Sequence, residues 1–415
     1  MKRILNNPLF SGSAVMIGGS LMANAVNYVY HLVMGRVLGP VDYGTLASVF
    51  ALLYIISIVP QSAGFAIVKF ISSAKNKEEV ADVYMSLRKF VLRLAWVMMI
   101  AVFFVSPFMA KYLHIENVFT VALVGLVLFA SLITLVLQTT LQGLLVFWGQ
   151  VGPTLVSSIG KLVMGLGLVY IGWGVFGAVL GIFLSVMLAY GYGLYLIRTQ
   201  DFSQKYKQIK LKPFVVYAFP VLVQALAFTS LFTVDLILVK HYLPEFDAGL
   251  YAALSTLGKI IYFAVQPISN VMFPIVSKRR TIGENYHHVF YLSFLMAVVG
   301  SSVIVGFFYL LPNLAIGVLY GQEYLVATKE LVWMGLFIAI YTLSYIVVSF
   351  LLSIGKTRIV ILPFVVSIMQ IVLINYYHGS ILQVIQVSLG CASLLFVGLG
   401  GYLGYYQVNK LYAKK

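Results

Sequence analysis

A stretch of 35 residues occurs twice in this chain, at residues 38–72 and again at residues 243–277. When the sequence is shifted by 205 positions without a gap, nine of these residues are identical, which is more than an apolar composition gives by chance. A duplication of this kind indicates two related halves, and we expect both halves to have the same fold. The identical pairs are Leu38 and Leu243, Asp42 and Asp247, Gly44 and Gly249, Ala47 and Ala252, Leu52 and Leu257, Ile55 and Ile260, Ile56 and Ile261, Gln61 and Gln266, and Ser72 and Ser277.

Twelve apolar runs follow one another along the chain, and each is long enough to cross a membrane. Charged residues make up only 9% of the chain, whereas a soluble domain has about 25% because its surface requires them. A helix of about 20 residues crosses the hydrocarbon core. We therefore expect an all-α polytopic membrane protein with about 12 transmembrane helices, six in each half. The expected spans are 11–35, 44–70, 90–110, 117–142, 153–171, 174–197, 213–240, 248–275, 289–311, 326–352, 358–377 and 380–407, with a short interfacial helix at 75–89.

Lys and Arg are distributed unevenly between the loops. If both termini are cytoplasmic, 20 of the 27 basic residues lie on the inner side and four on the outer side. Because basic loops stay inside, we expect a multi-pass protein of the cell (inner) membrane with cytoplasmic termini. This topology explains the net charge of +15, so nucleic acid is not an expected partner.

Six spans in a half is an even number, so both halves enter the membrane in the same direction and form a parallel repeat. Transporters built in this way place their site between the halves, around a central cavity. The predicted domains are an N-terminal six-helix lobe at 1–200, a cytoplasmic linker at 201–212 and a C-terminal six-helix lobe at 213–415.

Polar side chains recur at helical spacing in four spans, at equivalent places in the two halves. Because polar groups avoid lipid, these four faces are expected to converge on a water-filled interior. The alternative is that Asn and Gln hydrogen-bond to neighbouring helices. The candidate cavity residues are Asn24, Asn27 and His31 in the first span, Gln61 in the second, Gln224 and Asp235 in the seventh, and Lys259, Gln266 and Asn270 in the eighth.

Lys161 and Lys259 lie deep within predicted spans, each about 12–16 Å from the nearer end at 1.5 Å per residue. An ammonium group at that depth costs about 2.5–3.5 kcal/mol, so a partner or a bound anion is expected. Asp235 is the only acid deep within a predicted span. The interior is therefore cationic, which suits a diphosphate or an acidic sugar better than a cationic drug.

Asp235 and Lys259 have no charged counterparts in the first half, where the matching residues are Tyr30 and Tyr54. The two helices form a hairpin, and the two residues differ in depth by about 9 Å, most of which a lysine side chain spans. We expect the two groups to pair, directly or through water, when no substrate is bound. Substrate phosphate or a coupling proton would then compete for the pair; the alternative is a static structural pair.

Arg36 and Lys240 lie near the outer ends of the first and seventh spans. They are candidates for a ring of positive charge at the exit of the cavity, and anchoring at the membrane interface is the alternative.

Catalytic and metal-binding motifs are absent from the sequence. There is no H-E-x-x-H motif, no phosphate-binding G-x-x-x-x-G-K-S/T loop and no D-x-D motif. The single cysteine, Cys391, excludes an intrachain disulfide and a thiolate metal site. We expect a transporter and no enzyme, without a cofactor other than a coupling ion, H⁺ or Na⁺.

The segment Arg36-Val-Leu-Gly-Pro-Val-Asp-Tyr-Gly-Thr-Leu-Ala47 resembles a string, L-G-x-x-D/E-Y/F-G-x-x-A, that follows the first helix of a known family. The family comprises the polysaccharide exporters and Wzx-type oligosaccharide flippases of the multidrug/oligosaccharidyl-lipid/polysaccharide (MOP) superfamily. The second copy, Leu243 to Ala253, resembles the matching string after the seventh helix. The resemblance implies two six-helix lobes, alternating access, and export of undecaprenyl-diphosphate-linked glycans driven by an ion gradient. Related lipid II flippases usually have two further helices, which favours the oligosaccharide branch.

Three functions follow from these observations. The first is a flippase or exporter of lipid-diphosphate-linked oligosaccharide, with membrane lipids and a polysaccharide polymerase machinery as partners and a monomer as the expected state. The second is a cation-coupled multidrug exporter of the same superfamily, which would depend on an acid and not on lysines. The third is a membrane glycan polymerase or ligase, which would require a large outer loop, whereas the outer loops here are short.

Overall fold

The computed structural model describes residues 8–200, 202, 206–209, 212–282 and 284–412. Within these ranges the side chains of some helical residues, among them Gln61 and Gln224, lie outside the description. All regular secondary structure in the described ranges is helical. The chain forms two compact units, residues 1–225 and 226–415, which meet within the helix α8 (Lys212–Tyr242). The predicted lobe boundaries and the predicted cavity between the lobes stay predictions.

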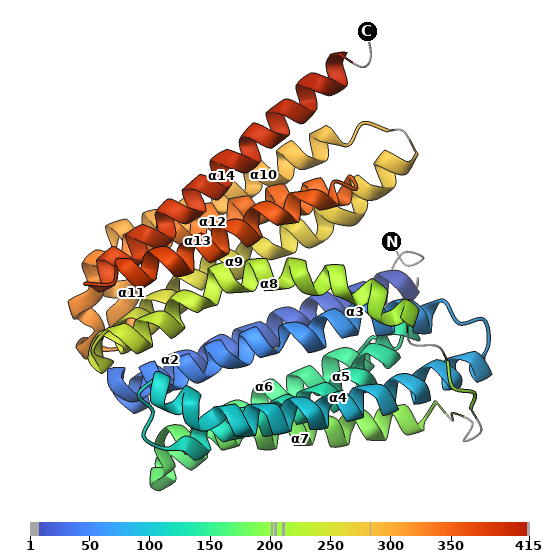
Figure 1. Ribbon diagram of the computed structural model, residues 1–415, viewed down its shortest axis with the longest axis horizontal. Coiled ribbons are helices and arrows are strands. Elements are labelled where there is room, and N and C mark those ends of the chain that lie inside the picture. Colours follow the sequence, from blue (N-terminus) through green and yellow to red (C-terminus); the bar gives the residue numbers. More distant parts are fainter. Residues whose placement is uncertain (1–7, 201, 203–205, 210–211, 283, 413–415) are drawn as a thin grey trace. The chain divides into compact units, whose positions relative to one another are not determined.

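The first unit contains long helices that run back and forth, from blue to green in Figure 1. The first of them, α2, is interrupted at Gly39, which has φ 72° and is followed by Pro40. A positive φ suits glycine, and this break separates the first two predicted spans. Gly172 and Gly174, also with positive φ, form the turn between α6 and α7. The helices are α2 (Pro8–Ile56), α3 (Ile58–Ser72), α4 (Lys77–Tyr112), α5 (Val118–Gly143), α6 (Trp148–Leu168), the π-helical turn η1 (Val169–Trp173) and α7 (Gly174–Arg198).

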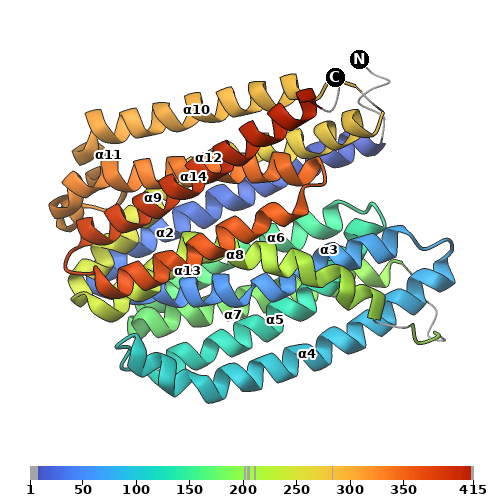
Figure 2. The same ribbon diagram turned by 45° about the horizontal axis from the view of Figure 1, so that its top comes forward.

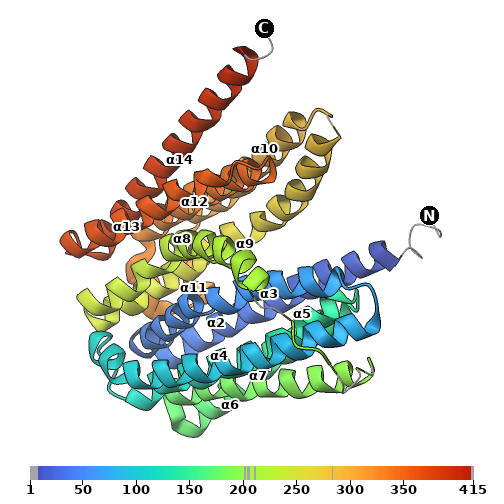
Figure 3. The ribbon, with the colours of Figure 1, turned by 45° about the vertical axis from the view of Figure 1, so that its right-hand side comes forward.

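The second unit repeats this order and adds short helical segments in its connections. Figure 2 shows α12 with α10 and α14, against both of which it packs. Figure 3 shows α13 and α14, which also pack against each other. The helix α12 also packs against α9, α10 and α14, so it lies at the core of this unit. After α8 the helices are α9 (Glu245–Thr281), α10 (His287–Leu310), α11 (Pro312–Leu319), η2 (Gln322–Ala327), α12 (Thr328–Ser353), η3 (Thr357–Val360), α13 (Ile361–Tyr376) and α14 (Ile381–Tyr412).

Ten helical stretches of the described residues are long and apolar enough to cross a membrane. Two of them, 18–72 and 148–198, have 55 and 51 residues, more than twice the length of about 20 that one crossing needs. The breaks at Gly39 and Gly172 divide these two stretches, as the predicted spans require. The helical segments therefore agree with the predicted order of twelve spans.

One predicted boundary was wrong, because the interfacial helix expected at 75–89 is continuous with the third span in the 36-residue helix α4. The side chain of Asn76 caps the helix by accepting a hydrogen bond from Glu79 N at 2.8 Å. Glu78 and Glu79 place negative charge at the positive end of the helix dipole. This end is thus a regular helix start, and the charged residues after it extend the helix beyond the apolar run.

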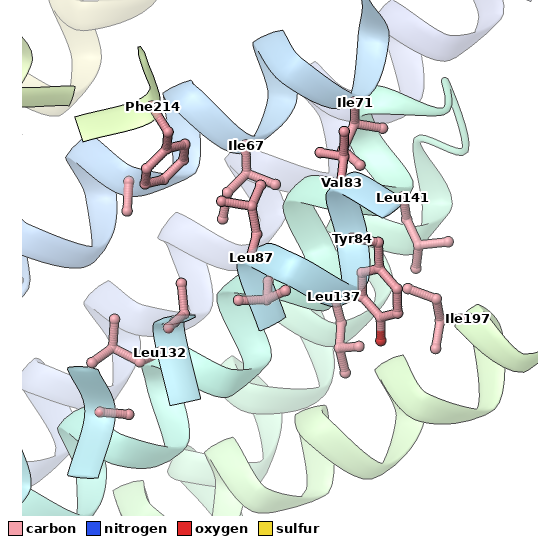
Figure 4. Close-up of a cluster of buried hydrophobic side chains, with 14 of the residues drawn as sticks. Ile67, Ile71, Val83, Tyr84, Leu87, Leu132, Leu137, Leu141, Ile197 and Phe214 are labelled. Carbon is pink, nitrogen blue, oxygen red and sulfur yellow. The ribbon is translucent and has the colours of Figure 1, made fainter. Parts of the chain in front are cut away.

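A cluster of apolar side chains from several helices forms the core of the first unit (Figure 4). Ile67 of α3, Leu87 of α4 and Leu132 of α5 are fully buried in it. Phe214, at the start of α8, is buried in the same cluster and lies 6.0 Å, between ring centroids, from Phe70. The beginning of α8 is therefore anchored to the first unit.

The described residues of the predicted linker lie against α4. Lys207 N donates to Asp82 Oδ1 at 2.6 Å, and Ile209 N donates to Ser86 Oγ at 3.2 Å. The ring of Phe202 also lies 5.0 Å from that of Tyr84. These described residues are consequently docked on the first unit.

Candidate functional site

Lys161 lies on α6 inside the first unit, where its side chain is only 9% exposed. Its ammonium group is placed over two aromatic rings of α2, with Nζ 4.6 Å from the centroid of Tyr30 and 5.2 Å from that of Phe50. No salt bridge to Lys161 is formed within the part of the chain that the structure describes. A cation–π contact contributes about 0.5–2 kcal/mol, less than the cost of about 2.5–3.5 kcal/mol for an ammonium in a membrane. The aromatic rings orient this charge but leave part of its cost for an anion to offset.

Glycines set the packing around Tyr30. A Cβ atom on Gly165 would lie 3.1 Å from Cε2 of Tyr30, so the absence of a side chain leaves space for the ring. A Cβ atom on Gly181 would lie 2.4 Å from the Cα of Gly165, so α6 and α7 approach closely at this level. The hydroxyl of Tyr30 donates to Ala178 O at 3.5 Å. The residue that holds Lys161 is therefore fixed by three helices.

The other candidates on α2 lie near this cluster or along the same helix. The ring of His31 lies 4.6 Å from that of Phe50, and its Nδ1 atom lies 3.4 Å from the hydroxyl of Tyr43. Asn24 is exposed and Asn27 is half-buried. The candidate Gln61 lies outside the described side chains. Within the first unit, Lys161 and His31 thus share aromatic neighbours.

Asp235 is buried in the second unit, with 1% of its surface exposed. Its Oδ2 atom accepts a hydrogen bond from the hydroxyl of Tyr251 at 2.5 Å, and its Oδ1 atom accepts one from Leu236 N at 2.8 Å. The Tyr251 hydroxyl also interacts with Ser388 of α14, whose Oγ accepts from Gln370 Nε2 of α13 at 2.9 Å. All four side chains are buried, so a polar network crosses this unit from α8 to α13.

Asp235 and Lys259, which we expected to pair directly or through water, form no direct ion pair, and pairing through water stays a prediction. The ammonium of Lys259 lies over the ring of Phe232, 4.6 Å from its centroid, and the two charges interact only at longer range. Hairpin register explains the difference: Asp235 lies nine residues before Pro244 and Tyr251 seven residues after it, whereas Lys259 lies fifteen after it. At 1.5 Å per residue, Tyr251 is therefore closer in depth to the carboxylate.

Aromatic side chains surround the remaining candidates of the second unit. Phe232 stacks on Tyr341 with 5.2 Å between centroids, and Tyr262 lies 5.4 Å from Tyr345. Gln266 Nε2 donates to the hydroxyl of Tyr262 at 3.3 Å. Asn270 is exposed, and the side chain of Gln224 lies outside the description.

The two exit-ring candidates have different environments. The side chain of Lys240 is fully buried and lies 3.4 Å from Glu245 Oε1, across the turn between α8 and α9. Arg36 is exposed at the end of the first part of α2. Lys240 thus has a structural role in its own hairpin, and the exit-ring role stays a prediction.

Several residues around Lys161 in the first unit and around Asp235 in the second were not identified from the sequence. Tyr30 and Tyr251 are tyrosines in apolar helices, where aromatic residues are common, and only their positions in the hairpins would have indicated a polar contact. Gln370 and Ser388 lie on helices where no polar stripe was recognised. Among the described residues, no group of three or more His, Cys, Asp or Glu side chains has the arrangement of a metal site.

An apolar pocket of the first unit lies between α4, α5 and α7 and encloses about 530 Å³. It is lined only by apolar side chains, among them Phe104, Phe119 and Phe176, and the first two of these are strongly exposed. A pocket without polar groups cannot orient a sugar or a phosphate, so it is suited to hydrocarbon.

Comparison with known proteins gives a family and a fold. The sequence model of the family described as "Polysaccharide biosynthesis protein" matches residues 33–329. A Haemophilus influenzae protein of the Lsg locus is 23% identical over 193 residues, a match that spans 44% of this chain and 46% of that protein. The chain thus matches about half the length of this curated relative.

Two solved structures are similar over nearly the whole chain. The lipid II flippase MurJ, in an inward closed conformation, has a TM-score of 0.76 and 16% identity, and the match covers 94% of this chain and 87% of that one. An inward-facing multidrug resistance MATE family transporter of the MOP superfamily has a TM-score of 0.74 and 13% identity, over 92% and 95% of the two chains. At this identity the likeness shows the fold, and it confirms the predicted all-α polytopic membrane fold.

Proposed function

This chain belongs to the polysaccharide biosynthesis protein family, and from that premise we propose that it moves lipid-diphosphate-linked oligosaccharide across the cytoplasmic membrane by alternating access. Its fold is that of the MOP-type transporters. The direction is export, both termini are cytoplasmic, and an H⁺ or Na⁺ gradient drives the cycle. The partners in this proposal are the lipid-linked glycan, membrane lipids and a polysaccharide polymerase machinery, and the protein acts as a monomer.

The observation that carries the proposal is the buried ammonium of Lys161, which has aromatic neighbours and no described carboxylate partner. A diphosphate offers several anionic oxygens to such a group, and a charge-assisted hydrogen bond is about twice as strong as a neutral one. Lys259 of the second unit is placed in the same way, over Phe232. A cationic drug would instead be repelled by both ammonium groups.

Asp235 is the residue to which we assign ion coupling. Its carboxylate is engaged by Tyr251 and Leu236, and is therefore not free to neutralise either lysine directly. The side-chain oxygen of Gln370, in the same network, is buried without a hydrogen-bond partner. Binding of a proton or Na⁺ at this network would change the charge of the second unit whether or not a ligand is bound at Lys161. The ion site and the ligand site are thus distinct, as coupled transport requires.

The test is transport of a fluorescent lipid-diphosphate-linked glycan by the full chain in liposomes, read by its accessibility to an impermeant quencher. Lys161→Gln should lower the rate at least tenfold, because the charge that binds the diphosphate is lost. Lys161→Arg should retain most of the rate. Lys111→Gln, an exposed lysine at the outer end of α4, is the matched control and should have the wild-type rate.

Two results would contradict the proposal. Equal rates for Lys161→Gln and the control would remove the electrostatic argument. Transport of a cationic drug that survives Lys161→Gln but is lost in Asp235→Asn would identify the protein as a multidrug exporter.

A further inference from the structure

A small polar pocket lies between α2 and α6 in the first unit, separate from the contact between Lys161 and Tyr30. Ser20 and Asn24 of α2 and Gln150 and Thr154 of α6 contribute its polar groups, and it encloses about 110 Å³. A water molecule needs roughly 10–15 Å³ of such volume. The pocket therefore has room for several water molecules or for one edge of a sugar ring.

The pocket offers hydrogen-bonding groups that the protein does not use. The side-chain oxygen of Gln150 is buried and has no hydrogen-bond partner. Ser20 and Asn24, at the other wall of the pocket, are exposed, so their polar groups are accessible to a ligand. Buried polar groups are nearly always paired, so an orphan acceptor of this kind calls for an explanation, and a ligand supplies one.

The walls of the pocket are held in place from outside. The hydroxyl of Thr154 donates to Gln150 O at 2.9 Å and accepts from Gln138 Nε2 of α5 at 3.2 Å. At the other wall, a Cβ atom on Gly19 would lie 2.0 Å from a methyl carbon of Val151, so α2 and α6 approach closely beside the pocket. The polar groups are thus positioned by packing before any ligand arrives, which lowers the entropic cost of binding.

The chemistry of the lining is neutral. It contains no charged side chain, so it does not select an ion; beside Gly19, Ala23 and Val151 it offers amides and hydroxyls. Such groups pair with hydroxyl and acetamido substituents, which are the polar groups of a sugar. A site whose buried groups need hydrogen bonds also rejects ligands that lack them.

The pocket and Lys161 are in register along the same two helices. Thr154 lies seven residues before Lys161 on α6, and Asn24 lies seven residues before His31 on α2. Seven residues are two turns, about 10 Å, and place both groups on one face. We propose that this pocket binds a neutral sugar residue of a ligand whose phosphate lies at Lys161, an inference that rests on the proposed function.

The experiment compares two soluble probes on the purified full chain in nanodiscs, by isothermal titration. One probe is farnesyl diphosphate, and the other is farnesyl diphosphate that carries one N-acetylhexosamine. Each hydrogen bond to a neutral group changes affinity by about three- to tenfold. The wild-type protein should therefore bind the glycosylated probe about ten- to hundredfold more tightly than the other.

Substitutions should separate the two subsites. Asn24→Leu and Gln150→Leu should each reduce the ratio between the probes several-fold and leave the affinity for farnesyl diphosphate unchanged. Lys161→Gln should weaken both probes equally. Gln142→Leu, the same change on α5 outside the pocket, is the matched control and should keep the wild-type ratio.

The outcomes distinguish the two proposals. Equal wild-type affinities for the two probes, or a ratio that survives both leucine variants, would overturn the sugar subsite and leave the proposed function standing. Failure of the wild type to bind either probe, together with absence of glycan transport, would overturn both. If Gln150→Leu alone removes the difference in affinity between the two probes and leaves the thermal stability unchanged, the sugar subsite is supported, with the side-chain oxygen of Gln150 as its main acceptor.

Discussion

The hydrogen bond between Tyr251 and Asp235 should contribute more to the stability of the second unit than a long-range interaction with Lys259. The Tyr251 hydroxyl donates to a fully buried carboxylate at 2.5 Å. Hydrogen bonds to charged groups contribute about 1.5–3 kcal/mol, against about 0.5–1.5 kcal/mol for neutral pairs. Tyr251→Phe removes this donor together with the interaction of the hydroxyl with Ser388, so we expect a loss of about 1.5–3 kcal/mol in the free energy of unfolding.

Tyr341→Phe is the matched control for this prediction. Tyr341 is equally buried, and its hydroxyl donates to a neutral acceptor, Phe228 O, at 3.1 Å. The assay is thermal unfolding of the detergent-solubilised full chain. At roughly 2–4 °C per kcal/mol for a unit of this size, Tyr251→Phe should lower Tm by about 3–12 °C and the control by about half as much or less.

A double-mutant cycle separates the two possible partners of Asp235. After Asp235→Asn the charged acceptor is absent, so Tyr251→Phe should cost about 1 kcal/mol less than it does in the wild type. The corresponding cycle with Lys259→Gln should show a smaller coupling, because the two charges are not in contact. The reasoning is refuted if Tyr251→Phe lowers Tm no more than Tyr341→Phe, or if Asp235 couples more strongly to Lys259 than to Tyr251.

Three further predictions follow from single features. Gly39→Ala should destabilise the protein by about 1–2 kcal/mol in the same assay because φ is 72°, and an unchanged Tm would mean that the turn does not need this conformation. Glu245→Gln should destabilise more than Lys240→Met, since only the first leaves a buried ammonium unpaired; the opposite order would show that the ion pair does not hold the turn. Reporter domains fused after residues 205 and 410 should both be cytoplasmic, and an external signal from either would exclude the parallel two-lobe topology.

Most of the helices could be predicted from the sequence because hydropathy is a local property. A run of apolar residues of membrane length forms a helix whatever its neighbours are, since backbone groups in lipid need internal hydrogen bonds. The boundary of α4 was wrong for the same reason. The apolar run of the third span begins near residue 90, but the helix begins earlier, at Lys77. The capping side chain of Asn76 and the acids after it stabilise this helical part outside the apolar run.

The depth of the candidate site residues along their helices could be predicted from the sequence, but their contacts could not. Position along a helix places Lys161 and Asp235 within the membrane, and both are buried. Which side chain each one meets depends on helix rotation and on residues of other helices, which sequence spacing does not determine. The polar pocket was not predicted because its α6 wall was not recognised as a polar stripe. Gln150 and Thr154 lie on the face of α6 that continues to Lys161, and only four other spans had been identified as polar on one face.

The repeat explains why the two units hold different polar groups at one level. At the offset of 205 residues, Asp235 corresponds to Tyr30 and Gln370 corresponds to Gly165. In the first unit, the missing side chain of Gly165 leaves space for the large ring of Tyr30. In the second unit, a smaller carboxylate is combined with a larger side chain, Gln370, that joins its hydrogen-bond network. The two exchanges compensate in volume, as close packing requires.

The same comparison shows that the buried lysines of the two units lie at positions that do not correspond. Lys161 corresponds to Val366, and Lys259 corresponds to Tyr54, so each unit has one deep ammonium beside an aromatic ring, on a different helix. Only the second unit has a buried carboxylate among its described spans. Under the proposed function, each half therefore has its own positive charge that an anionic group can bind, whereas the response to an ion is confined to the second half. A coupling ion can then alter one half while the other keeps its affinity for the ligand.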